Sequence, residues 1–578
     1  MLGTFGHTSK EDYFTYGNIY TIGPNMVVVS SPEDCRKVLG SSEFLKHPIY
    51  EGLSVKVNVM SSTQSEDDAR ARHKRVGHVF SHSNLSKVEG FIADHGVAAL
   101  FKKWDTAIDQ TLKKQAVEVN YLSHFKMMVF DVVSAHVFGQ SFDMLENDQL
   151  KVIDWASGYL SFVTVKFGLG CIAKPFYKLF RPGANKSIHD FYAFTDQRIQ
   201  ARRMYLQSEK STEMPTDALQ SFLQAENDGT RFSMTSTDVS AEATAMLLAG
   251  MATISQTMCY VLHYMLLNPT VYRKAVAEVR SAFSHSHTVT YLESKLHLPY
   301  IEACIYECLR IHAVSNTSLP RVVPTGGVFI QGHFIPQGTM VAVNIAGANH
   351  HQEAWENPRA FIPERFIDNP NAKKNVFSFS FGPRSCPGRN LAIRELLVLF
   401  SNMLKNYNFE VPKDSLFKPD VLDKHGNPQV MPSVQNLILG PKYPDRDCRV
   451  IIRKAAKNIL RVHRRLPQEM RFVGDQYVRA EFRSHRKVTD KQFLKPFFAQ
   501  WSSYLTLLRK QTGAGSPAQT QESHIGKHLD PELVERLDDD KAEQLLELHQ
   551  ASTGANREEG SAATAKPSVT SAPPPRRV

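Results

Sequence analysis

Cysteine is scarce in this sequence, with 7 among 578 residues, and the number is odd. This count argues against the disulfide framework of a secreted protein and is compatible with one cysteine that has a chemical role. The 31 glycines and 30 prolines show no repeat period, which excludes collagen-like and solenoid folds. Positive charge is in slight excess, since 68 Lys and Arg against 58 Asp and Glu give a net charge of +10. That excess fits acidic partners or anionic lipid, and we expect no nucleic-acid partner.

A hydrophobic N-terminal segment is also missing, because the chain turns polar soon after Phe5. The sequence therefore predicts no signal peptide and no membrane anchor at this end. Hydrophobic residues make up 42% and charged residues 22%, which is typical of globular proteins, and the length predicts more than one folded unit. One stretch without charge runs from Ala243 to Tyr272 and is long enough to cross a bilayer, but polar residues interrupt it. We predict that it forms a long helix buried in a large core.

Hydrophobic periodicity predicts a helix-rich first unit with small sheets. Strand-like runs flank a turn at Gly23 and Pro24, and apolar residues recur every three or four positions from about Leu85 to Arg280. Further predicted elements are a helix at 299–312, short strands at 328–330, 334–336 and 340–343, and a helix at 390–405. The predicted fold class is mainly α with small β-sheets, followed by a small all-α helical domain and a disordered tail. The expected boundaries are 1–444 for the first unit, 445–455 for a junction, 456–550 for the helical domain and 551–578 for the tail.

The most informative segment, Phe379–Gly388, reads F-S-F-G-P-R-S-C-P-G and precedes an apolar helix. Cys386 lies just before the helix N-terminus, where the dipole and free N–H groups favour a thiolate. Arg384 supplies a cation suited to a carboxylate, and Phe379 can shield the sulfur from water. Gly382 and Gly388 permit backbone conformations that a Cβ atom would disfavour.

This segment closely resembles the haem-binding loop of the cytochrome P-450 family, F-x-x-G-x-R-x-C-x-G, and every fixed position is met. The resemblance implies a cytochrome P-450 fold with haem b (iron protoporphyrin IX) as cofactor. It also implies that Cys386 is the axial thiolate ligand of the haem iron and that Arg384 pairs with a haem propionate. The alternative is a buried structural cysteine with a capping loop.

A second motif of that family is E-x-x-R, found here as Glu307-Cys308-Leu309-Arg310. Glu307 and Arg310 share a helix face and can pair, although such pairs are often surface salt bridges. Arg365 lies in a segment that resembles the family's P-E-R-F. The resemblance implies that these three residues form a buried structural ion network that holds the haem loop.

The segment Ala249-Gly250-Met251-Ala252-Thr253 resembles the family's oxygen-binding groove, A-G-x-D/E-T. It implies that Gly250 loosens the helix and that Thr253 hydrogen-bonds the bound dioxygen or its water. Ala252 departs from the pattern, since an acid is usual there, and Ser255, water or a substrate hydroxyl would have to replace it in the proton relay. The alternative is a helix crossing marked by Gly250, with the Thr253 hydroxyl bonded to the backbone.

Two weaker correspondences concern the haem propionates. The family's W-x-x-x-R pattern is replaced here by Ala69 and His73, and His73 either reaches a propionate or is a surface histidine. Arg321 matches a second propionate-binding arginine. The resemblance spans about Tyr13 to Pro441, and the membrane anchor, proline-rich hinge and first helix of microsomal members are expected to be missing.

The resemblance implies a monooxygenase that inserts one atom of O₂ into an apolar small molecule with electrons from NADPH, delivered by NADPH–cytochrome P-450 reductase. Basic residues near the cysteine loop could dock the acidic face of that reductase or simply be solvated: Lys373, Lys374, Arg389 and Arg394. The apolar segment 162–180 either contacts a membrane peripherally as a substrate-entry lip or belongs to the core. Enzymes of this kind usually lie at the surface of the endoplasmic reticulum membrane.

The second unit resembles the mitochondrial L-Y-R family, specifically the third succinate dehydrogenase assembly factor, over about Ile459 to His549. The residues that carry the resemblance include Tyr477, Arg483, Phe497, Trp501, Tyr504 and Leu529-Asp530-Pro531. It implies a non-catalytic binder of the iron–sulfur subunit of succinate dehydrogenase in the mitochondrial matrix, acting through 456–550. The L-Y-R tripeptide itself is replaced by Ala455-Ala456-Lys457, and the alternative is a basic amphipathic helical appendage.

Two further hypotheses remain open at this point. Ala252 favours a haem-thiolate protein that isomerises a peroxide without a reductase. Alternatively, the main role is that of a complex II assembly chaperone. The two units imply different compartments, so either the fusion needs an explanation or two neighbouring genes have been merged.

Overall fold

The computed structural model describes residues 5–455, with gaps at 55, 88, 112–115, 170–181, 209–214, 285–286, 317 and 370, and six further residues at 471, 474, 477, 478, 501 and 504. The chain divides into two compact units, Met1–Ala455 and Ala456–Val578. The predicted helical domain and tail therefore lie almost wholly outside the described residues.

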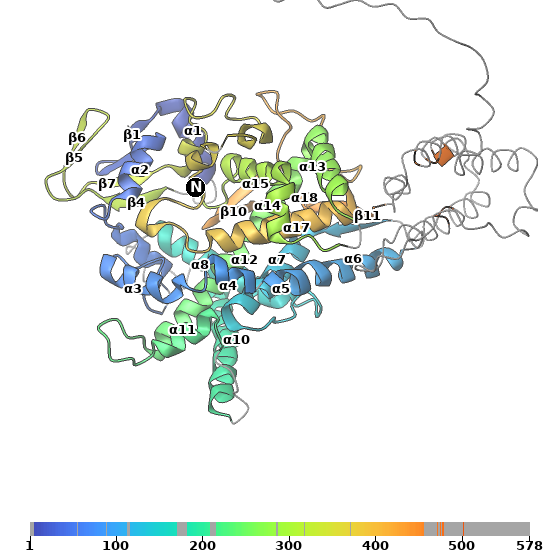
Figure 1. Cartoon of the computed structure of the whole chain (residues 1–578). Coiled ribbons are helices and arrows are strands. Elements are labelled where there is room, and N and C mark those ends of the chain that lie inside the picture. Colours follow the sequence, from blue (N-terminus) through green and yellow to red (C-terminus); the bar gives the residue numbers. More distant parts are fainter. Residues whose placement is uncertain are drawn as a thin grey trace, which may run out of the picture. The chain divides into compact units, whose positions relative to one another are not determined.

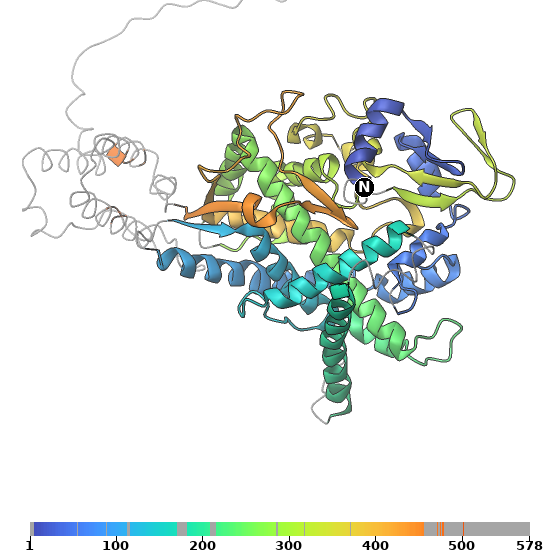
Figure 2. The same ribbon diagram turned by 180° about the vertical axis from the view of Figure 1, so that it is seen from behind.

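The first unit is mainly helical (Figure 1). Its α-helices are α1 (Phe5–Tyr16), α2 (Pro32–Gly40), α3 (Glu66–Gly77), α4 (His82–Lys87), α5 (Glu89–Phe91), α6 (Ala99–Asp109), α7 (Tyr121–Phe138), α8 (Leu150–Leu169), α10 (Pro182–Gln207), α11 (Ala218–Gln224), α12 (Ser236–Leu267), α13 (Pro269–Ala282), α14 (Tyr291–His297), α15 (Pro299–Ile311), α16 (Ile345–Asn349), α17 (Arg389–Asn406) and α18 (Pro444–Asp447). Seen from behind, α10 extends beyond the body of the unit (Figure 2). The predicted fold class is confirmed for this unit.

The strands form small sheets, as predicted. They are β1 (Ile19–Thr21), β2 (Met26–Val29), β3 (Ala116–Asn120), β4 (Leu319–Val322), β5 (Val328–Ile330), β6 (His333–Ile335), β7 (Met340–Val343), β8 (Tyr407–Glu410), β9 (Ser433–Asn436), β10 (Ile438–Pro441) and β11 (Arg449–Lys454). The largest sheet has the order β1-β2-β7-β4, in which β2 and β7 run parallel and the other pairs antiparallel. Its apolar face packs on α2 and on Phe377, two residues before the segment Phe379–Gly388, which we call the cysteine loop.

The strand β11 changes the expected boundary between the units. It pairs with β3 on one side and β8 on the other, so it is the central strand of a three-stranded sheet. Residues 445–455, which were expected to form a junction, therefore belong to the first unit: α18 and β11 lie there, and Val450 and Ile452 are fully buried. In the sequence R-V-I-I-R-K, buried residues alternate with partly buried ones, which is the two-residue period of a strand. This strand was missed in the sequence because the basic residues of the segment were assigned to the junction between the units.

The predicted long buried helix is α12, but it starts earlier and ends earlier than the stretch without charge. It begins at a capping box in which Thr235 and Asp238 bond reciprocally. It ends because Pro269 disfavours helical backbone at Asn268, where φ is −120° and ψ is 81°. Among the described residues, α12 is the helix that has the length and the apolar composition needed to cross a membrane. However, 72% of its most apolar 18-residue stretch is buried inside the unit. This degree of burial agrees with the prediction that the segment forms a helix of the core.

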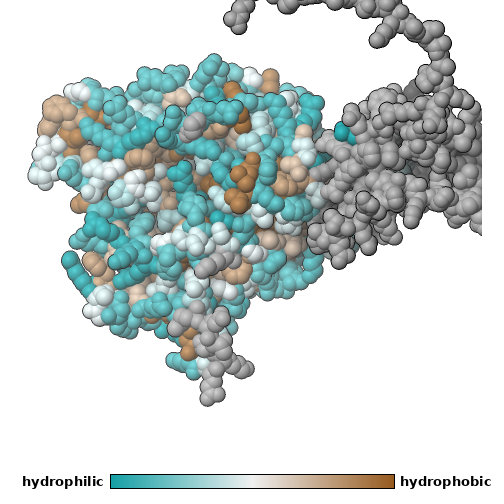
Figure 3. All heavy atoms as spheres, viewed as in Figure 1, coloured by the Kyte–Doolittle hydropathy of each residue, from teal (hydrophilic) through white to brown (hydrophobic). Residues whose placement is uncertain are grey.

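Around α12, the main hydrophobic core collects side chains from α6, α7, α13, α15 and α17. The outer face seen in Figure 3 is mostly hydrophilic, and hydrophobic residues gather at the corner where β5 and β6 lie. Phe329 and Phe334 of that hairpin are 62% and 54% exposed, and their ring centroids are 5.2 Å apart. The core and the surface thus separate as expected for a globular unit.

Candidate active site

The cysteine loop is shaped by the close approach of its backbone to α2. Gly382 has φ +72°, and a Cβ atom there would lie against the carbonyl oxygen of Leu39 and 2.7 Å from Gly40 Cα. The loop then closes on itself, because the amide of Cys386 donates to the carbonyl oxygen of Phe379 at 2.9 Å. The expectation for Gly382 therefore holds for two independent reasons, the φ angle and the lack of space.

Gly388 does not need the conformational freedom that we expected. Its φ is −80° as the N-cap of α17, and an added Cβ would lie 3.8 Å from the sulfur of Cys386 and 3.9 Å from Phe80. These are ordinary van der Waals distances, so what Gly388 provides is open space in front of the sulfur rather than an unusual backbone angle.

Cys386 is exposed to solvent, unlike the other cysteines that the structure describes, which are buried. Burial raises the pKa of its thiol, and hydrogen bonds from the amides of Gly388 and Arg389 lower the pKa by less. The helix N-terminus thus acts in the expected direction but does not by itself produce a thiolate. A metal ion at the sulfur would, because a coordinating thiol is deprotonated.

Within the loop, the side chain of Arg384 has one nitrogen that donates no hydrogen bond among the described residues. Its Nε donates to Glu66 at 2.9 Å and its Nη2 to the carbonyl oxygen of Ser65 at 3.2 Å. Its Nη1 is buried and has no hydrogen-bond partner among the described residues. A buried guanidinium nitrogen with no partner is costly. The haem propionate that the sequence predicted at Arg384 fits this unpaired donor.

The other two predicted propionate residues lie in the same cluster. Arg321 is 3% exposed on β4, and His73 is half-buried on α3. Burial and the positive charges of Arg384 and Lys46 lower the pKa of His73. The structure therefore brings these predicted residues together, and the binding of a propionate by His73 stays a prediction.

Two members of this cluster were missed in the sequence. Lys46 is 8% exposed, and burial together with its neighbours Arg384 and Arg321 lowers its pKa. Tyr50 is 6% exposed, and its hydroxyl accepts a hydrogen bond from Nη1 of Arg321 at 3.1 Å. Neither residue belongs to a motif, so the sequence offered no signal for them.

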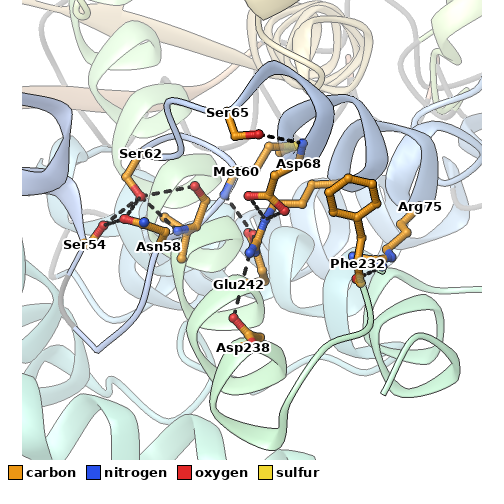
Figure 4. Close-up of polar contacts among 12 residues, drawn as sticks. Ser54, Asn58, Met60, Ser62, Ser65, Asp68, Arg75, Phe232, Asp238 and Glu242 are labelled. Carbon is orange, nitrogen blue, oxygen red and sulfur yellow. Dashed lines mark hydrogen bonds and ion pairs between the residues drawn. The ribbon is translucent and has the colours of Figure 1, made fainter. Parts of the chain in front are cut away.

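The neighbouring part of α3 is fixed by a separate polar cluster (Figure 4). The Ser65 side chain caps α3 through the amide of Asp68 at 3.3 Å. Arg72 pairs with Asp68 and with Glu242 of α12, and Glu242 accepts the amide of Met60 at 2.8 Å. These contacts hold α3 against α12, so the Ser65 carbonyl stands where Arg384 reaches it.

On α12, the predicted oxygen-binding residues form the accessible face of an otherwise buried helix. Between Val239 and Leu267, the residues that are not buried are Ala245, Met246, Ala249, Gly250 and Thr253. They recur at three- and four-residue spacing, so they lie on one face. The predicted groove residues Ala249, Gly250 and Thr253 are thus brought together on a solvent-reached surface.

Local contacts at this face match the alternative interpretation. A Cβ at Gly250 would lie 2.8 Å from a methyl group of Val133, so Gly250 permits close packing of α12 on α7, and the helix is continuous there. The hydroxyl of Thr253 donates to the carbonyl oxygen of Ala249 at 2.7 Å. Ser255 is fully buried and lies off the accessible face, with its hydroxyl 3.4 Å from the carbonyl oxygen of Ala252.

The three residues of the expected ion network are brought together. Glu307 and Arg310 are fully buried and form two hydrogen bonds, of 2.7 and 2.8 Å, and Arg365 Nε donates to Glu307 at 3.1 Å. Arg310 also donates to three backbone carbonyl groups. The alternative of a solvated surface pair is therefore excluded.

This network reaches the cysteine loop through Asn349. The carbonyl oxygen of Asn349 accepts from Arg310 at 3.0 Å, while its side chain accepts the amide of Phe377 at 2.9 Å and donates to Ser378 at 3.1 Å. Ser378 in turn donates to the carbonyl oxygen of Leu309. The ion network thus positions the start of the loop, through residues that no sequence motif identified.

The basic residues near the loop separate into two groups. Lys374 and Arg389 are exposed, whereas Lys373 pairs with Glu302 at 2.9 Å and Arg394 is 3% exposed and pairs with Glu89. Arg394 is therefore not available to a docking partner. Of the apolar segment 162–180, residues 170–180 lie outside the described residues, and Phe162 is partly buried against the main core.

Few residues of the second unit are described. The rings of Tyr477 and Trp501 are 6.0 Å apart, and those of Trp501 and Tyr504 are 5.5 Å apart and nearly perpendicular. Trp501 and Tyr504 are both helical, as predicted. Arg483, Phe497 and Leu529-Asp530-Pro531 lie outside the described residues.

Comparison with known proteins agrees with both resemblances. A family model described as Cytochrome P450 matches residues 8–433, and one described as Complex1_LYR-like matches residues 452–547. The chain is 36% identical to the cytochrome P450 monooxygenase helB1 of Aspergillus fumigatus over 78% of this chain and 77% of that protein. It is 35% identical to helB2 of the same organism over 76% and 87%, and 28% identical to the benzoate 4-monooxygenase bphA of Aspergillus niger over 69% and 82%.

The match to the first family covers well over half of the chain and includes the cysteine loop, the ion network and the α12 face. The relatives named as monooxygenases cover most of their own length. The chain therefore belongs to the cytochrome P450 family as a monooxygenase, which implies a haem cofactor, a substrate, O₂ and an electron donor, and it carries a LYR-like domain towards its C-terminal end.

Proposed function

We propose that the first unit inserts one oxygen atom from O₂ into an apolar organic molecule, with electrons that NADPH supplies through NADPH–cytochrome P450 reductase. The observation that carries this proposal is the exposed Cys386 two residues from Arg384, whose buried Nη1 has no partner among the described residues. Haem bound there would supply the iron chemistry of O₂, and a thiolate ligand favours O–O cleavage.

The residues of this chain would then bind the haem and orient the substrate. Arg384 and Arg321 would neutralise the carboxylates of the cofactor, and Cys386 would supply the sulfur ligand. Ala245, Met246 and Ala249 give the accessible face of α12 its apolar character, which favours an apolar substrate. Because the Thr253 hydroxyl donates to Ala249, it offers its lone pairs to a water molecule or to a substrate hydroxyl.

The test compares the wild type with Cys386→Ala in the full chain. The wild type is expected to show the thiolate-type carbonmonoxy spectrum and NADPH-dependent product formation with added reductase, and the variant neither. An unchanged spectrum in the variant would overturn the assignment of Cys386. Turnover of a peroxide without NADPH or reductase, and none with them, would instead favour the peroxide isomerase suggested by Ala252.

For the electron donor, the exposed cations Lys374 and Arg389 support docking of an acidic reductase surface. A K374E/R389E variant is expected to slow reduction by the reductase, most strongly at low salt, while reduction by dithionite is unchanged. The matched control is K413E, a change of equal sign at an exposed loop residue. Equal rates in all three proteins would exclude this docking surface.

We also propose that the LYR-like segment binds the iron–sulfur subunit of succinate dehydrogenase and assists its maturation. The support is the family match over 452–547 together with Tyr477, which is 39% exposed. Pull-down of that subunit by the full chain should fall in Y477A and R483A variants. Absence of association by the wild type would remove this role and leave the oxygenase proposal intact.

The two proposals imply two locations, the endoplasmic reticulum membrane surface and the mitochondrial matrix. Antibodies to each unit would measure the size of the native polypeptide in fractionated cells. A shared band near 65.2 kDa in one fraction would support a fusion that works in one compartment. Two smaller bands in different fractions would mean two proteins, each with its own location.

A further inference from the structure

Lys46 and Tyr50 lie between α2 and α3 and face the predicted propionate residues. The helix α3 lacks the tryptophan and arginine that the family pattern places there, and it has Ala69 and His73 instead. We propose that Lys46 binds a haem carboxylate directly, and that Tyr50 holds Arg321 in position for the same cofactor. This inference rests on the haem assignment above and adds the residues that compensate for α3.

The backbone fixes Lys46 beside Arg321. The two residues form an antiparallel bridge, and the amide of Val322 donates to the carbonyl oxygen of Leu45 at 2.9 Å. Residues directly opposite each other in an antiparallel pair point to the same face. Two buried cations are therefore held side by side, an arrangement that is unfavourable without an anion between them.

The Lys46 ammonium has donors to spare. It carries three N–H groups, and the carbonyl oxygen of Ser61, at 2.6 Å, is its one hydrogen-bond acceptor within the described part of the chain. The turn that presents Ser61 is itself fixed, because the Ser62 hydroxyl accepts the amide of Val59 at 2.9 Å and a hydrogen bond from Ser54 at 2.7 Å (Figure 4). Lys46 is thus aimed by a rigid support and retains capacity for a ligand.

The charges around Lys46 are mostly positive. Burial and the neighbouring Arg384 and Arg321 lower its pKa to about 7, and Glu66 opposes them. Glu66 is already paired with Arg384 at 2.9 Å. Haem b carries two carboxylates, which supply the negative charge that this cluster lacks.

Tyr50 contacts both Lys46 and Arg321 through its aromatic ring. The Lys46 nitrogen lies 4.9 Å from the centre of its ring, and the Arg321 guanidinium carbon lies 5.7 Å away. Its hydroxyl accepts a hydrogen bond from Arg321 Nη1 at 3.1 Å. The ring and its hydroxyl therefore contact both cations, which makes Tyr50 a positioning residue.

The test measures haem loss from the full-length holoprotein to an excess of apomyoglobin. K46M should lose haem about ten times faster than the wild type, the factor expected for one charge-assisted hydrogen bond. Y50F should lie between the two, and K46R should rescue most of the effect because it keeps the charge. The urea midpoint of the haem-free K46M chain should fall less than that of a buried lysine without cationic neighbours, since removal of a repelled buried cation offsets the loss of the hydrogen bond to Ser61.

The matched control is K405M. Lys405 is 2% exposed and donates to the carbonyl oxygen of His287, so it is also a buried lysine bound to a backbone carbonyl, but it lies near the end of α17. K405M should lower the urea midpoint and leave the rate of haem loss unchanged. Haem loss from K46M at the wild-type rate, or a K46M chain destabilised like K405M, would overturn the proposal. A wild-type chain that takes up no haem would instead contradict the haem assignment itself.

Discussion

Replacing Arg310 by lysine should destabilise the first unit strongly even though the charge is kept. Arg310 donates five hydrogen bonds, two to Glu307 and one each to the carbonyl oxygens of Asn349, Pro358 and Ala360. A lysine has three donors on a single nitrogen and cannot span these positions. At least two buried acceptors would be left unpaired, at about 1–3 kcal/mol each, so the expected loss is about 2–6 kcal/mol.

The loss should not be larger, because Glu307 keeps the hydrogen bond from Arg365 at 3.1 Å and that from the amide of Ile362 at 2.8 Å. The assay is urea unfolding of the full-length holoprotein, followed by the thiolate-type carbonmonoxy spectrum and by far-ultraviolet circular dichroism. Because Asn349 connects Arg310 to the cysteine loop, the spectrum should be lost at lower urea than the helical signal.

The control is Arg449→Lys. Arg449 also forms a network, with Glu118 and Asp414, but the side chains of these partners are 42% and 68% exposed. Exposed pairs contribute about 0–1 kcal/mol, so R449K should have little effect. If R310K were no more destabilised than R449K, the argument that burial and the number of hydrogen bonds determine the cost would be refuted.

Three further predictions test the packing and the charges of the same unit. Gly382→Ala should abolish the thiolate-type spectrum because its Cβ would meet the backbone of α2, whereas Gly426→Ala, with φ +78° and nothing within 4 Å, should lose only about 1 kcal/mol of stability; equal behaviour would contradict the steric argument. Gly250→Ala should destabilise by about 1–3 kcal/mol through overpacking against Val133, and Val133→Ala in the same chain should restore most of the urea midpoint; additive losses would exclude that contact as the cause. Burial raises the pKa of Asp131 to about 6, so its proton is held more tightly in the folded state and stability should fall as pH rises from about 4 to 6, by roughly 2 kcal/mol. Asp131→Asn should remove that fall, and parallel pH profiles of urea midpoints for both proteins would show the reasoning to be wrong.

Local patterns in the sequence predicted the parts of the site whose chemistry depends on neighbours in the chain. The turn at Gly382, the cysteine before α17 and the Glu307–Arg310 pair each need only a few consecutive residues. Helix ends were predicted less well, as the break at Asn268 shows. The stretch without charged residues continues past Pro269, whereas the helix ends before that proline. Strand β11 was missed because its pairing partners, β3 and β8, lie elsewhere in the chain.

The sequence by itself determined the family, the residues of the ion network and the presence of a second, LYR-like unit, and it predicted Cys386 as the sulfur ligand. Tertiary structure alone decided which cations lie together, since Lys46 and Arg321 meet only through the bridge between distant segments. It also decided that Arg394 is buried, that Gly250 serves helix packing, and that Asn349 links the ion network to the cysteine loop. The physical reason is that burial and contact depend on what the folded chain places opposite a residue, whereas a motif records only which residues are neighbours in sequence.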